Sequence, residues 1–478
     1  MLITDAKERK QRRVLGEHLT PSELFRRYVL PELVPLRTQY RWVDFFAGAG
    51  DLIFPLLELT PPEERIAFFR NHIFLFDIQA KMVEQSVQRA KNLGIPEEIA
   101  RQNIRRQDTL SNYPKEILEG PLPVYHVTNP PYLYLGYISK HPETKHYLKH
   151  FRDVNEGYQD LYQIALINDL RHNIDRMVYI IPANFLFGHA VSNKIRDDFL
   201  QFYNISKAVV LERGVFEHTG THVVICFFER KQHPKHEVQE FNAIKVNHHE
   251  WRRVYRLLPD FHYRAGAEFE EFTRKFRAHR PLKVSYYLYH IDIENNPGDI
   301  EVFLVDANKL EGGGYRKYRA LINAKLYRRI KANPLFVRTL DTGALDGRAG
   351  LYLISEKFGV DGIAVTSSPY RTHPVQVFLE PALSMEDVLL LRDYFNLMLE
   401  HFRAITDSEF LTTYKYSESA YTRKYLGLSQ VKSLIETFPI LGLPPLWRRS
   451  FETLVQRRNA EGVIGLLESL KKQEGLSL

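Results

Sequence analysis

The chain has 478 residues, of which 44% are hydrophobic and 26% charged, so collagen-like, low-complexity and intrinsically disordered classes are excluded. A chain of this length is expected to form roughly two to four domains. No run of about 18 apolar residues is present, so no transmembrane helix is expected. The charged N-terminus is unlike a signal peptide, and the single cysteine, Cys226, excludes an internal disulfide or a cysteine-based zinc site. We therefore expect a cytoplasmic protein without a metal.

The charge is unevenly distributed. The formal net charge is +7, and residues 251–340 alone hold 18 Lys/Arg against 10 Asp/Glu. Such a mildly basic balance is compatible with a polyanionic partner, whose contacts should concentrate in the second half of the chain.

The first half alternates between strand-like and helix-like segments. Amphipathic helices are expected over 78–93 and 157–174. They lie among six β-rich runs, at 41–46, 72–77, 124–129, 176–182, 205–212 and 221–229. Strands separated by helices predict an α/β sheet, mostly parallel. The short loop between the last two runs predicts an antiparallel hairpin at one sheet edge.

The second half lacks this alternation and predicts a mixed α+β region. It contains short aromatic strands at 283–293, three glycines at 312–314 and a helix over 385–405. The polar stretch 231–250 predicts a boundary, which divides the chain into domains 1–240 and 241–478.

One tetrapeptide, Asn129-Pro130-Pro131-Tyr132, directly follows a predicted strand. Two prolines fix two φ angles and remove two backbone donors, so this strand end is rigid. The carboxyl ends of parallel strands are where α/β proteins bind ligands. The alternative is an ordinary proline turn.

A glycine-containing turn and two acids also follow strands. Gly48 and Gly50, in the segment 44–51, allow close backbone approach to a ligand, although glycine pairs also form plain turns. Asp77 lies 27 residues beyond Gly50 and could accept both hydroxyls of a ribose. Asp108 precedes the proline segment, and either acid could instead cap a helix.

In this order, the motifs resemble the S-adenosylmethionine-dependent DNA adenine-N6 methyltransferases of bacterial restriction–modification systems, in their gamma arrangement. Over residues 12–230 the resemblance adds Gly16–Pro21, similar to the family's G-x-x-x-T-P element, and Asp160-Leu161-Tyr162, similar to its D-L-Y helix. Residues 181–185 and Val215-Phe216 also match. The family's D-P-x-C-G-x-G-x-F motif is altered here, with Phe45, Ala47 and Leu52 at three of its positions.

The resemblance implies a Rossmann-like methyltransferase domain over 1–240 and a target-recognition domain over 241–478. It implies S-adenosylmethionine as cofactor and a cofactor site formed by Thr20, Pro21, Asp44, Phe46, Gly48, Gly50, Asp77, Ile78, Asp108 and Asn129. It implies a catalytic role for Asn129, Pro130 and Tyr132, and stacking of the target base on Tyr132 and Phe216.

These residues suit methylation of an amine whose lone pair is delocalised. The Asn129 side-chain carbonyl and the Pro130 backbone carbonyl could each accept one hydrogen bond from adenine N6, which favours a localised lone pair. The methyl donor is already activated, so positioning matters more than acid–base chemistry. A base must also leave the duplex, and stacking on an aromatic ring recovers about 1–3 kcal/mol of the cost.

The segment 315–331 interleaves aromatic and basic residues. Phosphate contacts are expected from its cations, with a solvated helix face as the alternative: Arg316, Lys317, Arg319, Lys325, Arg328 and Arg329. The expected partners are double-stranded DNA and a separate restriction endonuclease, with no membrane, and the protein is expected to be a monomer.

Two alternatives stay open. A methyltransferase with the same proline motif could act on RNA bases or on protein glutamine, although such enzymes generally lack the N-terminal element and a large C-terminal half. A catalytically silent DNA-binding or specificity subunit is the other alternative, disfavoured by Asn129, Tyr132 and both glycines. A fused nuclease is not expected, because no P-D-(D/E)-x-K pattern is evident.

Overall fold

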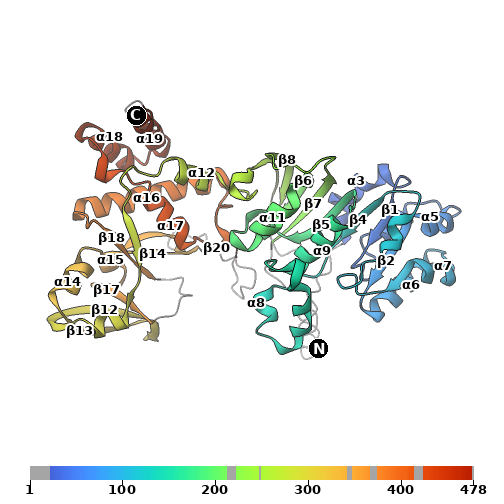
Figure 1. Ribbon diagram of the computed structural model, residues 1–478, viewed down its shortest axis with the longest axis horizontal. Helices are drawn as coiled ribbons and strands as arrows, with labels where there is room; N and C mark the ends of the chain where they lie inside the picture. The colour runs from blue at the N-terminus through green and yellow to red at the C-terminus, as the bar shows by residue number, and fades with distance from the viewer. Residues whose placement is uncertain are drawn as a thin grey trace. The chain divides into compact units, whose positions relative to one another are not determined.

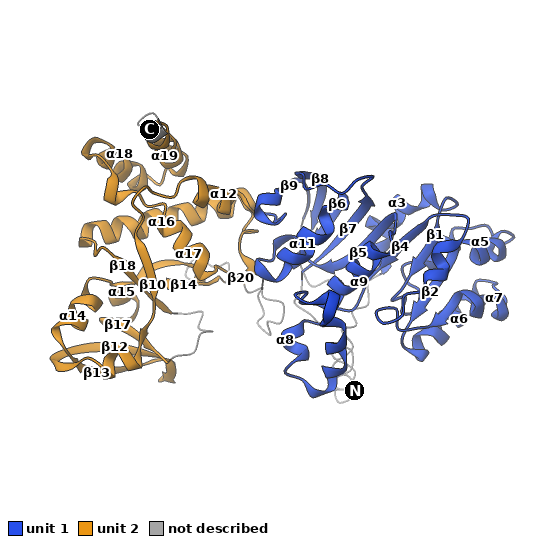
Figure 2. Ribbon diagram, in the orientation of Figure 1, with its two compact units in different colours: residues 1–265, 415–418 blue, residues 266–414, 419–478 orange. Residues whose placement is uncertain are grey.

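The computed structural model describes residues 22–212, 222–246, 249–341, 347–366, 374–413 and 424–475. Two compact units make up the chain (Figure 2): residues 1–265 with 415–418, and residues 266–414 with 419–478. Among the described residues, no helix is long and apolar enough to cross a membrane.

A nine-stranded sheet forms the centre of the first unit (Figure 1), in the order β3-β2-β1-β4-β5-β7-β6-β8-β9. Its strands are β1 (Arg41–Asp44), β2 (Ile73–Asp77), β3 (Ile104–Arg106), β4 (Val124–Thr128), β5 (Arg176–Pro182), β6 (Tyr203–Leu211), β7 (Val223–Arg230), β8 (Gln239–Val246) and β9 (Glu250–Leu257). The first five pair with one another in parallel, and β5 is antiparallel to its other neighbour, β7. The predicted mostly parallel α/β fold is therefore confirmed.

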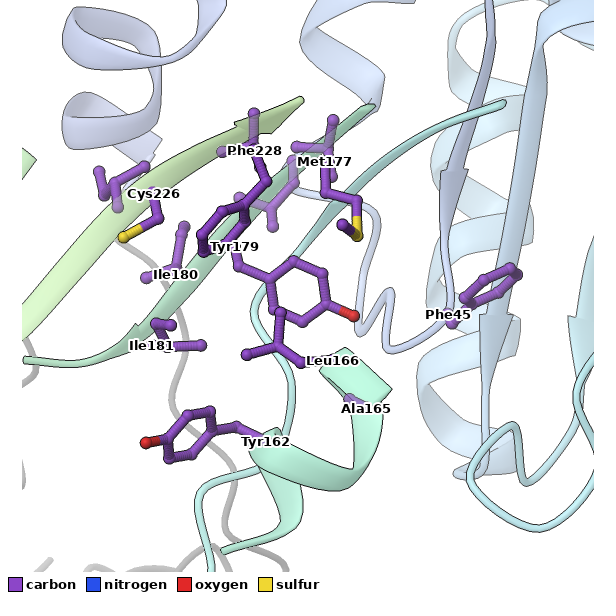
Figure 3. Packing of buried hydrophobic residues seen from close by; sticks show 14 of the residues in the cluster. Phe45, Tyr162, Ala165, Leu166, Met177, Tyr179, Ile180, Ile181, Cys226 and Phe228 are labelled. Carbon is purple, nitrogen blue, oxygen red and sulfur yellow. The ribbon is translucent and has the colours of Figure 1, made fainter. Parts of the chain in front are cut away.

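Burial explains why these strands were recognisable in the sequence. Every residue of β1 and β4 is buried. Parallel strands covered on both faces are near-continuous apolar runs. The helices of this unit include α4 (Phe54–Glu58), α5 (Arg65–His72), α6 (Ala80–Asn92), α7 (Glu97–Asn103), α9 (Leu161–Arg171) and α11 (Asn193–Leu200). Figure 3 shows Leu166 of α9 packed beside Tyr179 of β5 in the core of this unit.

The strand order reverses between β1 and β4. From β1 the chain proceeds outward through β2 to β3, then returns to β4 on the other side of β1. Such a switch point leaves a crevice beyond the carboxyl ends of the two central strands, where α/β proteins bind ligands. The glycine turn follows β1 and the Asn129 segment follows β4, so both lie at this position.

The sheet is wider than the sequence indicated. The expected hairpin, now β6 and β7, is antiparallel but lies inside the sheet, and the edge hairpin is formed by β8 and β9. The expected boundary at residue 240 falls within β8, and the first unit continues to Ala265. The polar residues of β8 and β9 alternate with buried ones because one face of these strands is exposed, which made the pair resemble a linker.

The second unit has the mixed α+β architecture that was expected. An antiparallel sheet has the order β10-β18-β14-β16 and a second sheet the order β11-β17-β12-β13. Their strands are β10 (Lys283–Tyr286), β11 (Leu288–Tyr289), β12 (Pro297–Glu311), β13 (Gly314–Ile322), β14 (Leu335–Arg338), β16 (Gly350–Leu353), β17 (Gly362–Val365) and β18 (Val375–Glu380). The short strands expected over 283–293 are β10 and β11, which are separated at Tyr287, whose φ is 71°. The last residues of that range form a short helix instead, α13 (His290–Glu294).

Helices complete the second unit. They include α12 (Glu268–Lys275), α14 (Ala324–Lys331), α16 (Met385–Thr406), α17 (Leu428–Ile435), α18 (Pro445–Gln456) and α19 (Ala460–Gly475). The helix expected over 385–405 is confirmed as α16, whose first turn is capped by the Ser384 hydroxyl.

Candidate functional site

The Asn129 segment is held by the start of α9. The two prolines offer no backbone donor, and the amide of Leu133, two residues after Pro131, donates to the Asp160 carboxylate at 2.8 Å. The Leu161 amide returns a bond to the Leu133 carbonyl at 3.3 Å. Asp160, from the D-L-Y segment, is 4% exposed, and it anchors the Asn129 segment to a helix that packs in the core.

Tyr132 is buried rather than open. Its side chain is 2% exposed, and its hydroxyl donates to the Ile180 carbonyl of β5 at 2.6 Å and also contacts the Asn129 side-chain oxygen. Burial raises the pKa of this hydroxyl well above its usual range, so it stays protonated. The hydroxyl therefore connects the Asn129 amide to the neighbouring strand, a contact that the sequence did not predict.

The turn after β1 requires both of its glycines, for different reasons. Gly48 and Gly50 have φ angles of +53° and +79°. A Cβ at Gly50 would lie 2.3 Å from the Phe54 ring, so a side chain there would collide with the core. A Cβ at Gly48 would meet no atom of the described part of the chain within 4 Å. Gly48 therefore leaves space beside a partly buried turn of backbone.

Asp77, at the end of β2, binds the glycine turn. Its carboxylate accepts the Gly48 amide at 2.9 Å and the Gln79 amide at 2.8 Å. Burial raises the pKa of Asp77, although both amide bonds oppose the shift. The next residue, Ile78, is 48% exposed and is thus an apolar side chain open to solvent beside a buried acid.

Asp44, the last residue of β1, carries an incompletely satisfied carboxylate. One oxygen accepts the Thr128 hydroxyl at 2.6 Å and the Phe46 amide at 3.0 Å. The other oxygen is buried and has no hydrogen-bond partner among the residues that the structure describes, and Asp44 is 1% exposed. Burial raises the pKa of Asp44 to about 6, although its hydrogen bonds from Thr128 and Phe46 oppose the shift.

These features fit the cofactor that the resemblance implies. The unsatisfied Asp44 oxygen suits a cationic ammonium group, and the space beside Gly48 admits close approach of a ligand to the backbone. Asp77 retains acceptor capacity beyond its two amide bonds, because a carboxylate offers about four acceptor positions. The exposed Ile78 offers an apolar surface for a planar base.

Asp108 lies in a different setting. Its two carboxylate oxygens accept the Ser111 amide at 3.2 Å and the Ser111 hydroxyl at 2.7 Å, and Lys149 lies 3.5 Å away. Partial burial raises the pKa of Asp108, but the bonds from Ser111 outweigh it and the net pKa is lowered. Residues 109–111 form a turn and no helix begins there, so these bonds hold a turn rather than cap a helix, and a cofactor contact by Asp108 stays a prediction.

Several expected site residues meet at the β1/β4 switch point. The turn residues Phe46, Gly48 and Gly50, with Asp44 and Asp77, are joined to β4 by the Thr128 bond, one residue before Asn129. Thr20, Pro21 and Phe216 lie outside the described residues. Thr128 and His126 were not predicted as site residues. The signal that could have found them is their period-two spacing before Asn129, which places both on one face of β4.

The predicted phosphate-contacting residues lie in the second unit, on β13 and α14. The stretch 314–331 contains seven basic residues and no acidic one. All six predicted residues are exposed, and five of them form no ion pair with any residue in the described part of the chain: Arg316, Lys317, Lys325, Arg328 and Arg329. The stretch is an edge strand followed by a helix, so a single solvated helix face, the alternative interpretation, would account for only part of its cations.

Comparisons with known proteins support the expected class. The sequence profile of a family described as N-6 DNA Methylase matches residues 79–276, which includes the Asn129 segment. This match supports a DNA methyltransferase of the N6 type. No curated protein sequence matches the chain.

Solved structures with related folds include several restriction–modification proteins. The protein in a DrdV–DNA complex is 12% identical to this chain. The match covers 53% of this chain and 31% of that protein, with a TM-score of 0.39. A type I restriction–modification methyltransferase subunit from Streptococcus thermophilus is 15% identical. The match covers 48% of this chain and 47% of that protein, with a TM-score of 0.33. The type IIG restriction endonuclease BpuSI is 12% identical, with 92% and 61% covered and a TM-score of 0.40. The chain thus spans between 31% and 61% of the length of these proteins.

Proposed function

We propose that this chain transfers a methyl group from S-adenosylmethionine to the N6 atom of adenine in duplex DNA. The observation that carries the proposal is the Thr128–Asp44 bond of 2.6 Å, which joins the strand before Asn129 to the glycine turn across the switch point. A turn suited to the cofactor and a segment suited to an amino group therefore lie together at the carboxyl ends of two neighbouring strands, where α/β proteins bind ligands. The order of these segments along the chain supports the gamma class.

The cofactor would supply a methyl group on a sulfonium, which is activated for in-line displacement. Asp44, Gly48, Asp77 and Ile78 would hold it. Asn129 and the Pro130 carbonyl would accept the two N6 hydrogen atoms of adenine and so direct the nitrogen lone pair toward the methyl group. Both acceptors are amide carbonyls, which are too weakly basic to keep a proton, so the proton lost after transfer would leave to water.

Base flipping is part of the proposal, because N6 cannot reach a cofactor from within the duplex. Stacking of the flipped base on Tyr132 requires an accessible ring, whereas the ring is 2% exposed here. We propose that the hydroxyl of Tyr132 contributes as well, by orienting the Asn129 amide through their contact. Stacking on Phe216 remains part of the same proposal, and stacking on Tyr132 would require its ring to become accessible when the base enters.

The proposal is tested by supplying labelled S-adenosylmethionine together with duplex DNA, single-stranded RNA or a protein extract. We expect label in the duplex DNA alone. Label in RNA or protein would support the corresponding alternative methyltransferase. Absence of label in all three, from a protein that binds DNA, would support the catalytically silent subunit.

A first prediction concerns the pH dependence of cofactor binding. A cationic ammonium prefers the ionised form of Asp44, whose pKa is raised to about 6. A raised carboxyl pKa means that the proton is lost only as the pH rises through that value, so binding should strengthen over the same interval. Affinity for S-adenosylhomocysteine should therefore fall about tenfold between pH 7 and pH 5, as measured by calorimetric titration.

The control for this prediction is Asp44→Asn. The variant should bind S-adenosylhomocysteine weakly and with the same affinity across the interval, because it has no carboxyl group to titrate. An undiminished pH dependence in the variant would assign the titration to another group.

We further propose that the second unit binds DNA through β13 and α14, in keeping with the seven cations there. If Arg328 and Arg329 contact phosphates, replacing both with Gln should weaken binding about equally on cognate and unrelated duplexes. The slope of log affinity against log salt should fall by about 0.9 for each lost contact. Gln is preferred to Ala because the Arg329 guanidinium lies 4.2 Å from the centre of the Phe378 ring and its stem contributes to packing.

A matched control is available in the same unit. Arg457 and Arg458 are also adjacent and exposed but lie outside the basic stretch. Their double Gln variant should retain the salt slope of the unmodified protein. A loss confined to the cognate duplex in the Arg328/Arg329 variant would instead indicate base reading, at roughly 1–3 kcal/mol. The choice of DNA sequence would then depend on this stretch.

A separate restriction endonuclease remains the proposed protein partner.

A further inference from the structure

The first unit contains a buried carboxylate that the proposed mechanism does not use. Asp169 of α9 is 1% exposed. It accepts the Tyr113 hydroxyl at 2.8 Å and the Tyr179 hydroxyl at 2.6 Å, and it lies 2.5 Å from His126 Nδ1. Within the described residues, no Lys or Arg forms an ion pair with it. Burying a carboxylate among uncharged donors is costly, so its retention calls for a reason.

The partners of His126 fix its tautomer. Nδ1 faces a carboxylate oxygen, which can only accept, so Nδ1 carries a proton. Nε2 lies 3.2 Å from the Phe45 backbone nitrogen, which can only donate, so Nε2 carries none. His126 is therefore a neutral imidazole. Its contact with Asp169 fixes the orientation of the ring, and the ring in turn places an acceptor for a backbone amide.

That amide belongs to the glycine turn after β1, called the cofactor turn below because the proposed function assigns it to the cofactor. Phe45 is the first residue after β1, and its amide lies just beyond the last register pair of β1 with β4. Without the imidazole, this buried donor would lose the acceptor that the structure gives it. In Figure 3 the Tyr179 ring extends from β5 with its hydroxyl on the Phe45 side, consistent with one network reaching from β5 to the turn.

Two side chains of β4 thus hold the turn at consecutive residues. His126 accepts from the Phe45 amide, and Thr128 donates to the Asp44 carboxylate. Both lie on the same face of β4 because they are two residues apart. The strand that carries them ends at Asn129, so any shift of the turn relative to this strand is a shift relative to Asn129.

We propose that His126, oriented by Asp169, is a positioning residue that holds the cofactor turn in register with Asn129. The inference rests on the proposed function, because it assigns that turn to the cofactor. It predicts that the acceptor at the Nε2 position, rather than the network as a whole, determines cofactor affinity.

Two variants test the contacts of the two ring nitrogens of His126 separately. His126→Gln retains an acceptor at about the distance of Nε2 and loses the donor to Asp169. His126→Asn retains a donor near Nδ1 and loses the acceptor for Phe45. Calorimetric titration with S-adenosylhomocysteine should show affinity weakened about tenfold or more in His126→Asn, and within about threefold of the unmodified protein in His126→Gln. Both variants should unfold at a lower temperature.

Tyr179→Phe is the matched control, since it removes one donor from Asp169 without touching the Phe45 amide. It should lower the unfolding temperature and leave the affinity within about twofold. An equal loss of affinity in the Gln and Asn variants would overturn the inference and leave the network a purely stabilising one. Failure of the unmodified protein to bind S-adenosylhomocysteine would instead overturn the proposed function, and the inference with it.

A measurement on the unmodified protein keeps the inference testable if neither variant folds. Hydrogen exchange of the Phe45 amide should be strongly slowed without any ligand, because the imidazole already accepts its proton. Exchange at the rate of an open loop, in the absence of S-adenosylhomocysteine, would contradict a turn held by His126.

Discussion

Replacing Asn129 with Ala should reduce the rate of methyl transfer by about 10²–10³-fold or more, by analogy with removing one group that binds a transition state. The amide oxygen acts mainly when the amine becomes pyramidal, so affinities for S-adenosylhomocysteine and DNA should stay nearly unchanged. Single-turnover kinetics with a saturating cofactor would measure the rate, and binding titrations the two affinities.

Asn204 offers a matched control, because it is an exposed asparagine on β6, away from the switch point. Asn204→Ala should retain the rate of the unmodified protein. Full activity in Asn129→Ala would refute the proposed chemistry. A parallel loss of cofactor affinity would show that Asn129 also contacts the cofactor, as the resemblance implies, or that the substitution disturbs the turn through the neighbouring Thr128.

Replacing Asp77 with Ala should weaken S-adenosylhomocysteine binding by about tenfold or more, since a hydrogen bond to a charged group contributes about 1.5–3 kcal/mol. The structure adds a second cause to the expected loss of ribose contacts. Asp77 also holds the Gly48 amide at 2.9 Å, so the glycine turn itself should loosen in the variant. Calorimetric titration measures the affinity, and the unfolding temperature reports whether the variant is folded.

Asp51 is the control for this substitution. It lies in the same turn region but forms a half-exposed ion pair with Arg89 at 2.6 Å. Such pairs contribute at most about 1 kcal/mol to stability, so Asp51→Ala should bind the cofactor analogue normally. Unchanged affinity in a folded Asp77→Ala protein would remove Asp77 from the cofactor site.

The central strands were predictable because they are short apolar runs between helices, and β1, β2, β4 and β5 lie where expected. The glycine turn and the Asn129 segment directly follow two of those strands. Parallel topology alone therefore brings them together at the carboxyl ends of the strands. The edge strands β8 and β9 were missed because each exposes one face, and their alternating polar residues resemble a linker. Nothing in the local sequence marked the end of the first unit.

The side-chain contacts that hold the site were less predictable. His126 and Asp169 are separated by 43 residues, and Tyr132 and Ile180 by 48, so only the packed fold brings each pair together. The burial of Tyr132 depends on the same packing. By contrast, the need for glycine at Gly50 follows from its φ and from Phe54 four residues later, which a local motif can encode.

The central claim is methylation of adenine N6 in duplex DNA, and nucleoside mass spectrometry tests it most directly. The purified chain would be incubated with plasmid DNA and S-adenosylmethionine carrying a deuterated methyl group, and the DNA digested to nucleosides. The account predicts labelled N6-methyldeoxyadenosine from the unmodified protein and a near-complete loss of it from Asn129→Ala. Label on cytosine, or equal label from both proteins, would contradict it.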